Sequence, residues 1–135
     1  MEFVKNNLLL FFVAFASGAM LLWPLVRRTS GGPWVSPAQA TQLINREDAQ
    51  VLDVRDPGEY GTSHALGARN LPLARIESGA GDAVKKKDAS LIVYCDTGDR
   101  AAKAVAALRK QGYTRVVNLS GGFGAWKQAG LPVER

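Results

Sequence analysis

The chain is poor in the residues that form disulfides and metal sites, with one cysteine and one histidine among its 135 residues. A single cysteine, Cys95, excludes an internal disulfide and a zinc site of the four-cysteine type. With only His64 besides, no set of metal-ligating residues is visible in the sequence. Nothing in the cysteine content requires an oxidising compartment, and any thiol chemistry must come from Cys95.

Long runs of basic charge are also lacking, although the net charge is +5. The basic residues are scattered, and their densest cluster is the triplet Lys85–Lys87. A triplet is shorter than the runs that mark nucleic-acid sites, so we expect no nucleic-acid partner. A modestly basic surface suits anionic lipid headgroups or small anionic substrates instead.

One segment, residues 8–26 (LLLFFVAFASGAMLLWPLV), carries no charge. As a helix it would rise about 28 Å, close to the thickness of the bilayer's hydrocarbon core. Trp23 near its end and Arg27-Arg28 directly after it are typical of a membrane interface. A cleaved signal peptide with Ala38-Gln39-Ala40 as its cleavage site is the alternative, but the uncharged run is too long for one and ends too far before that site. We therefore expect a transmembrane helix.

The sequence predicts four segments: a short N-terminal tail (1–7), the transmembrane helix (8–26), a Gly/Ser/Pro linker (27–34) and one domain (35–135). Two arginines follow the expected span and one lysine, Lys5, precedes it. This asymmetry predicts a single-pass protein of a bacterial-type inner membrane, with the lipid bilayer as a partner and the domain in the cytoplasm.

Within the domain, short apolar runs alternate with helical patterns. The predicted strands are Gln50–Val54, Ser90–Tyr94 and Arg115–Leu119, and the predicted helices are Ala38–Asn45, Ala101–Gln111 and Phe123–Ala129. Ser36, Pro37 and Gln39 have the spacing of a capping box at the start of the first helix. Strands that are apolar on both faces and separated by helices indicate an α/β domain with a mostly parallel, covered sheet.

Cys95 directly follows the apolar run 90–94, and the predicted helix 101–111 begins shortly after it. In open α/β sheets, ligands bind where such loops leave the carboxyl ends of the strands. Backbone amides and a helix N-terminus there would favour a thiolate and hold an anion. A lone cysteine is otherwise a small buried hydrophobe. The predicted site consists of Cys95 as the nucleophile and a substrate-binding loop of Asp96, Thr97, Gly98, Asp99 and Arg100, the last as the anion anchor.

From Val35 to Val133 the sequence resembles a rhodanese-homology domain. The blocks that carry this resemblance are VLDVRDPGEY (51–60), SHALGARNLP (63–72), IVYCDTGDRAAKAVAALRKQGY (92–113) and VVNLSGGFGAWKQAGLPV (116–133). The resemblance implies a central, mainly parallel five-stranded sheet flanked by helices. It also implies a sulfurtransferase without a cofactor, in which Cys95 takes a sulfane sulfur from a donor such as thiosulfate and passes it to cyanide or a thiol acceptor.

The loop after Cys95 differs from related loops in two ways. Relatives that hydrolyse phosphate esters have Cys-x5-Arg, whereas Arg100 gives Cys-x4-Arg, a tighter loop that suits a single sulfur atom. Active sulfurtransferases often have a basic residue directly after the cysteine, where this chain has Asp96, and Asp99 adds a second carboxylate. Both acids would repel a doubly charged donor, so we expect weak thiosulfate:cyanide activity and a persulfide as the donor.

Other polar and glycine residues are expected to support the scaffold. The pattern Asp56-Pro57-Gly58-Glu59 predicts a second capping box. Asp53 and Arg55 are expected to form an ion pair, and His64 to order a loop, as its place in the resembling block implies. Gly121-Gly122 predicts a sharp turn, and Trp126 is expected to pack against the sheet.

Two other functions remain open from the sequence. A non-catalytic rhodanese-like module would recruit a partner to the membrane, and the two aspartates next to Cys95 favour it. In a membrane-side redox sensor, Cys95 would be oxidised to a sulfenic acid or a mixed disulfide.

Overall fold

The computed structural model describes residues 2–30, 33–96 and 99–135, and the side chains of residues 23–30 lie outside that description. The chain divides into two compact units, residues 1–30 and 31–135.

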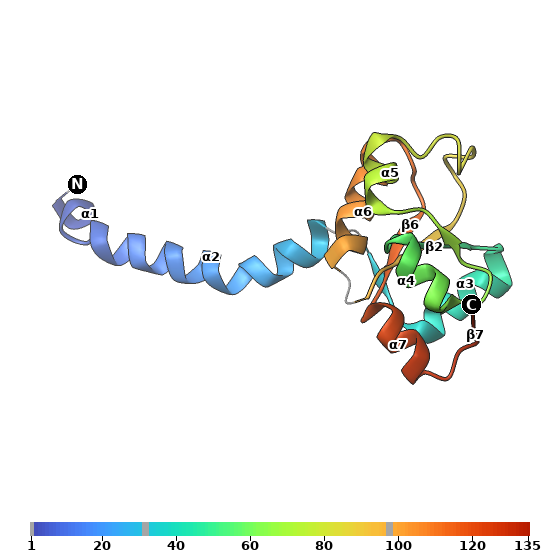
Figure 1. Cartoon of the computed structure of the whole chain (residues 1–135). Helices are drawn as coiled ribbons and strands as arrows, with labels where there is room; N and C mark the ends of the chain where they lie inside the picture. Colours follow the sequence, from blue (N-terminus) through green and yellow to red (C-terminus); the bar gives the residue numbers. More distant parts are fainter. Residues whose placement is uncertain (1, 31–32, 97–98) are drawn as a thin grey trace. The chain divides into compact units, whose positions relative to one another are not determined.

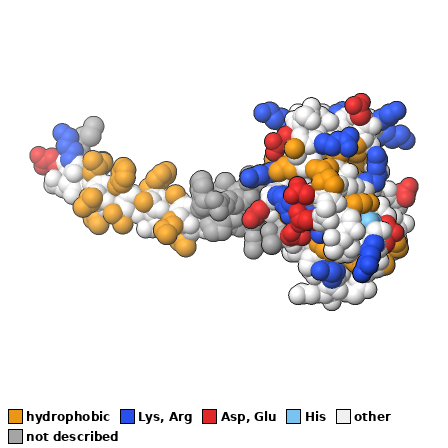
Figure 2. Space-filling view, in the orientation of Figure 1, with side chains coloured by type: hydrophobic (Ala, Val, Ile, Leu, Met, Phe, Trp, Pro, Cys, Tyr) orange, Lys and Arg blue, Asp and Glu red, His pale blue; other side chains and the backbone are white. Residues whose placement is uncertain are grey.

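The first unit consists of two helices, α1 (Glu2–Asn6) and α2 (Leu8–Ser30). Hydrophobic side chains line the described part of α2 (Figure 2), and Phe12 and Phe15 are 76% and 82% exposed. Within the described residues, however, no helix combines the length and the apolar character needed to cross a bilayer.

The expected transmembrane helix over residues 8–26 is therefore not supported. Of residues 8–26, only 8–22 have described side chains. The side chains of Trp23 and Arg27-Arg28, which were expected at a membrane interface, lie outside the described residues. A lipid bilayer as partner and a cytoplasmic orientation depend on that span and are likewise not supported.

The second unit is built on a five-stranded parallel sheet with the strand order β1-β6-β5-β2-β4. The strands are β1 (Trp34–Val35), β2 (Gln50–Asp53), β4 (Arg69–Asn70), β5 (Leu91–Tyr94) and β6 (Val116–Leu119). A smaller antiparallel pair joins β3 (His64–Ala65) to β7 (Val133–Glu134). The expected α/β fold with a central five-stranded sheet is confirmed.

Side chains alternate between two apolar layers along the central strand β5, because successive residues of a strand face opposite sides. Leu91, Val93 and then Cys95 pack in one layer, whereas Ile92 and Tyr94 pack in the other. Helices α5 (Leu73–Ser78) and α6 (Asp99–Lys110) cover the first layer, and α3 (Pro37–Glu47) and α7 (Gly122–Gln128) cover the second (Figure 1). The sheet is therefore buried on both faces, as the apolar strands predicted.

The two predicted capping boxes have different outcomes. At α3, the Ser36 hydroxyl accepts a hydrogen bond from the Gln39 amide at 3.1 Å, and the Gln39 side chain accepts one from the Ser36 amide at 2.9 Å. At α4 (Pro57–Thr62), the Asp56 side chain makes no capping hydrogen bond, so that prediction is wrong. The Glu59 carboxylate keeps its hydrogen bond with the Asp56 backbone and also binds the Arg100 guanidinium, so only one half of the expected box is present.

Candidate functional site

The register of the sheet places three loop-bearing strand ends together. Asp53 at the end of β2 pairs with Tyr94 at the end of β5, and Val93 pairs with Asn118 near the end of β6. Because all three strands are parallel, the segments that follow them meet at one edge of the sheet. Cys95 is the first residue beyond the central strand, so it lies in the middle of this edge.

The thiol of Cys95 lies at the beginning of α6. Its Sγ atom accepts a hydrogen bond from the Ala101 amide at 3.3 Å. The Cys95 carbonyl accepts another from the Phe123 amide at 2.8 Å, which ties α7 to the same loop. An amide donor at a helix N-terminus stabilises negative charge on the sulfur. Cys95 itself is only 1% exposed, so a reactant must reach a buried sulfur atom.

Arg100, predicted as the anion anchor, is already paired with two carboxylates. Its guanidinium donates to both oxygens of Glu59, at 2.9 Å and 3.1 Å, and to Asp96 Oδ2 at 3.2 Å. Glu59 comes from α4, so this contact joins two parts of the chain that are 41 positions apart. We call Glu59, Asp96 and Arg100 the carboxylate clamp.

Charge in the carboxylate clamp is shared unequally between its two acids. The hydrogen bonds from Arg100 lower the pKa of Glu59 from 4.5 to about 2. The pKa of Asp96 is raised, chiefly by its hydrogen bond with Glu59 and then by partial burial. Glu59 therefore stays ionised to lower pH than Asp96, and Asp96 is the first of the two acids to accept a proton as the pH falls.

A buried polar cluster lies next to the Cys95 loop, at the same edge of the sheet. Arg55 pairs with Asp53 at 2.7 Å and also reaches Asp96 Oδ1 at 3.4 Å. The Tyr94 hydroxyl donates to Asp53 Oδ2 at 2.7 Å, and burial raises the pKa of Tyr94, as does this carboxylate. The Arg55 guanidinium lies 4.5 Å from the ring centre of Phe123. The predicted Asp53–Arg55 ion pair is confirmed, and it links the Cys95 loop to the core.

A family comparison identifies this arrangement. The family model of the rhodanese-like domain matches residues 36–129. The chain belongs to the rhodanese-like domain family. The match begins at the N-cap of α3 and ends just after α7, so it spans the described site.

Known proteins similar to this rhodanese-like domain include sulfurtransferases. A sulfurtransferase from Allochromatium vinosum is 36% identical over 98 residues, which cover 73% of this chain and 90% of that protein. The probable adenylyltransferase/sulfurtransferase MoeZ of Mycobacterium tuberculosis is 42% identical over 82 residues, 61% of this chain. The match spans only 21% of MoeZ's length. At family level, these relatives support a rhodanese-type sulfurtransferase.

A solved structure has the same fold. The rhodanese-like domain of the Alr3790 protein from Anabaena sp. superimposes with a TM-score of 0.70 at 29% identity, covering 76% of this chain and 78% of that one. The shared topology places the Cys95 loop of this rhodanese-like domain at the carboxyl edge of its sheet, where the fold class binds ligands.

The structure brings together only part of the predicted substrate loop. Asp96 and Arg100 meet in the carboxylate clamp, and Asp99 is the exposed first residue of α6. Thr97 and Gly98 lie outside the described residues. Among the described residues, no three of the types His, Cys, Asp or Glu gather closely enough to hold a metal ion.

Two residues of the site were missed by the sequence analysis. Glu59 was predicted as the acid of a capping box, because it lies three residues after Asp56. This local spacing does not reveal its distant partner, Arg100. Tyr94 was predicted only as the last residue of a strand, yet its hydroxyl bridges Asp53 and the Ala65 amide, the latter at 3.0 Å. An aromatic residue with a polar end directly before Cys95 was the available signal.

His64 and Trp126 hold the second, smaller sheet of the rhodanese-like domain. His64 Nδ1 contacts the Tyr60 carbonyl at 2.8 Å and Nε2 contacts Glu134 at 3.1 Å, while its ring stacks on Tyr60. The Trp126 indole donates to the Pro132 carbonyl at 2.8 Å and its ring packs in the apolar layer of α3 and α7. Both residues have the packing and loop-ordering contacts expected of them.

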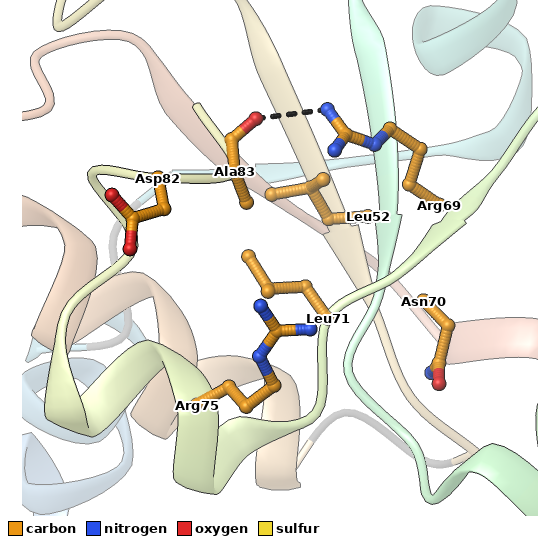
Figure 3. Close-up of a pocket in the computed structure, with 7 residues that line it drawn as sticks. All are labelled: Leu52, Arg69, Asn70, Leu71, Arg75, Asp82 and Ala83. Carbon is orange, nitrogen blue, oxygen red and sulfur yellow. Dashed lines mark hydrogen bonds between the residues drawn. The ribbon is translucent and has the colours of Figure 1, made fainter. Parts of the chain in front are cut away.

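A cavity of about 150 Å³ lies beside β4 and is separate from the Cys95 loop (Figure 3). Two arginines face it, and one of them, Arg69, donates to the Ala83 carbonyl at 2.8 Å. The remaining lining residues are Leu52, Asn70, Leu71, Arg75 and Asp82. None of the described residues among positions 95–101 lines this cavity, so it is distinct from the surroundings of Cys95.

Proposed function

We propose that this chain is a single-domain sulfurtransferase or persulfide carrier in which Cys95 is the catalytic nucleophile. Its thiol first loses a proton to solvent. The thiolate then attacks the sulfane sulfur of a donor, a new S–S bond forms at Sγ, and the donor's bond to that sulfur breaks with its electron pair. With thiosulfate the leaving group is sulfite, and with a persulfide it is a thiolate.

The second step returns the enzyme to its starting state. A thiol or cyanide acceptor attacks the terminal sulfur of the Cys95 persulfide, the S–S bond breaks, and the electron pair returns to Sγ as a thiolate. The products are a new persulfide or thiocyanate. No electrons are gained or lost overall, so the cycle needs neither an oxidant nor a cofactor.

The observation that carries this proposal is the Sγ–amide contact at the start of α6. The Ala101 N–H donates to Sγ at 3.3 Å, so the developing charge meets a fixed donor at the positive end of a helix. Asp96, Thr97, Gly98, Asp99 and Arg100 are proposed as the loop that receives the donor. Because Cys95 is 1% exposed, the donor should present a slender terminal sulfur rather than a bulky group.

A non-catalytic binding module is the second candidate, and two observations favour it. Cys95 is buried, and Arg100 is occupied by Glu59 and Asp96 rather than open to a substrate. A module of this kind would use the exposed surface around α4 and α6 to bind a partner protein, and Cys95 would serve only in packing.

Mass spectrometry of the intact full chain separates these candidates. The purified protein is incubated with thiosulfate or with cysteine persulfide, and its mass is compared with that of Cys95→Ser treated in the same way. We expect a gain of one sulfur atom on the native chain, reversed by cyanide or a thiol and absent from Cys95→Ser. If neither donor adds sulfur, the sulfurtransferase proposal is wrong and the binding module is preferred.

A further inference from the structure

The carboxylate clamp changes the charge that a reactant meets near Cys95. Arg100 alone would attract an anion, but Glu59 holds both its terminal nitrogens and Asp96 holds one of them. The other nearby guanidinium, Arg55, is paired with the buried Asp53 and also with Asp96. Two cations therefore face three carboxylates, and neither cation is available as a free anion anchor.

We propose that Glu59 determines donor specificity by holding Arg100, so that the Cys95 site favours reactants of low negative charge over oxyanions such as thiosulfate. This proposal rests on the proposed sulfurtransferase function and deepens it. Glu59 acts through Arg100 and is a positioning residue, not a catalytic one. To bind a dianion, Arg100 would have to give up hydrogen bonds that already match its planar geometry.

Glu59 and Arg100 lie where their charges affect the surroundings of the Cys95 sulfur. Arg100 is on the first turn of α6, directly before Ala101, whose amide contacts Sγ. The pKa of Arg100 is raised, first by the Glu59 hydrogen bonds, and the charge on Cys95 adds to the rise, so the guanidinium and the sulfur interact. Neutralising Glu59 would leave the two cations facing two carboxylates, so the region next to the sulfur would lose its excess negative charge and repel an anion less.

Alkylation of the lone cysteine measures this charge directly, because every adduct reports on Cys95. Iodoacetamide is neutral and iodoacetate carries one negative charge, and both react by the same step: sulfur displaces iodide from carbon. The ratio of the two rate constants cancels differences in thiolate fraction and access. It therefore reports the local preference for an anion whether or not sulfur transfer occurs.

We expect Glu59→Gln to raise the iodoacetate:iodoacetamide rate ratio of the full chain about twofold to fivefold at low salt, and less in 0.5 M NaCl. Its KM for thiosulfate should fall while kcat changes little. Glu59→Asp, which keeps the charge, should retain a ratio close to that of the native chain. Asp96→Asn removes the other acid of the clamp and should shift the ratio in the same direction as Glu59→Gln.

Glu47→Gln is the matched control. Glu47 also pairs with an arginine, Arg115, at 2.5 Å and has similar exposure, but it lies at the opposite end of the strands. Its rate ratio should equal the native one. An unchanged ratio in both Glu59→Gln and Asp96→Asn overturns the clamp proposal, as does a thiol that reacts with neither reagent. A shifted ratio without any sulfur adduct supports the clamp and overturns only the sulfurtransferase.

Discussion

Gly122 lies against the backbone of Cys95, so closely that no side chain fits between them. A Cβ atom at Gly122 would collide with the Cys95 carbonyl oxygen and would lie 2.5 Å from that of Asp96. The φ angle of Gly122 is +62°, in the left-handed region that favours glycine. The start of α7 thus fixes the path of the chain through the Cys95 loop.

Gly122→Ala should destabilise the domain and displace the loop. The positive φ angle and the collision with two carbonyl oxygens together should lower the free energy of unfolding by about 1–3 kcal/mol. Urea unfolding measures this loss. The rate of Cys95 alkylation by iodoacetamide should also change, because the displaced loop carries the sulfur.

Gly124→Ala is the control on the same helix. Gly124 is exposed, a Cβ atom there would meet no atom within 4 Å, and its φ is not positive. Alanine should therefore be neutral or stabilise α7 by up to about 1 kcal/mol. Equal losses in the two variants would show that the close approach at Gly122 does not matter.

The longer elements of this fold could be predicted from the sequence because their patterns are local. The capping box at Ser36 and Gln39 marks the beginning of α3, and apolar runs mark β2, β5 and β6. In contrast, β1, β3, β4 and β7 have two residues each, too few for any periodicity. These short strands form because they pair with distant strands. For the central sheet, only the family resemblance implied that strands beyond β2, β5 and β6 are present.

The candidate site could be predicted only in its local part. Cys95 and Arg100 were identified because they flank the beginning of α6. Glu59 was not, because its position three residues after Asp56 predicts only a local contact at a helix start. Its bidentate hydrogen bond with Arg100 joins segments that are far apart in the sequence. Side-chain partners of this kind are fixed by tertiary structure.

Tyr94→Phe tests the buried polar cluster below the Cys95 loop. The Tyr94 hydroxyl donates to Asp53 and accepts from the Ala65 amide, and all three residues are buried. Removing the hydroxyl leaves the Asp53 carboxylate and the Ala65 amide without this hydrogen-bond partner. The free energy of unfolding should therefore fall by about 1–3 kcal/mol. Urea unfolding of Tyr113→Phe gives the comparison, because its buried hydroxyl donates to an uncharged acceptor, the Val84 carbonyl. A loss for Tyr94→Phe no larger than for Tyr113→Phe would contradict the importance of the charged acceptor.

Asn118→Leu should stabilise the sheet. Asn118 is fully buried in β6, and within residues 2–30, 33–96 and 99–135 neither polar atom of its side chain finds a hydrogen-bond partner. Leucine has a similar shape and avoids the cost of burying an unpaired amide, so the free energy of unfolding should rise by about 1 kcal/mol.

Asn70→Leu is the opposite case and serves as the control. The Asn70 amide donates to the carbonyls of Asp53 and Arg55, at 3.1 Å and 2.9 Å. Its loss should destabilise the domain by about 1–3 kcal/mol in the same urea experiment. A destabilised Asn118→Leu protein would show that the Asn118 amide makes a stabilising contact after all.

The carboxylate clamp should also make stability depend on pH. Because Arg100 lowers the pKa of Glu59 from 4.5 to about 2, the ionised form is favoured in the folded state, and its contribution is complete above pH 4.5 and lost as the pH falls toward 2. Asp96, whose pKa is raised, has the opposite sign and offsets part of this loss. Since about a third of the Glu59 side chain is exposed, solvent screening limits the net effect to about 1 kcal/mol or less.

Between pH 5 and pH 3, the urea midpoint of the native chain should therefore fall further than that of Glu59→Gln, and 0.5 M NaCl should narrow the difference between the two midpoints. Parallel falls at low salt would mean that the Glu59–Arg100 pair contributes nothing to stability.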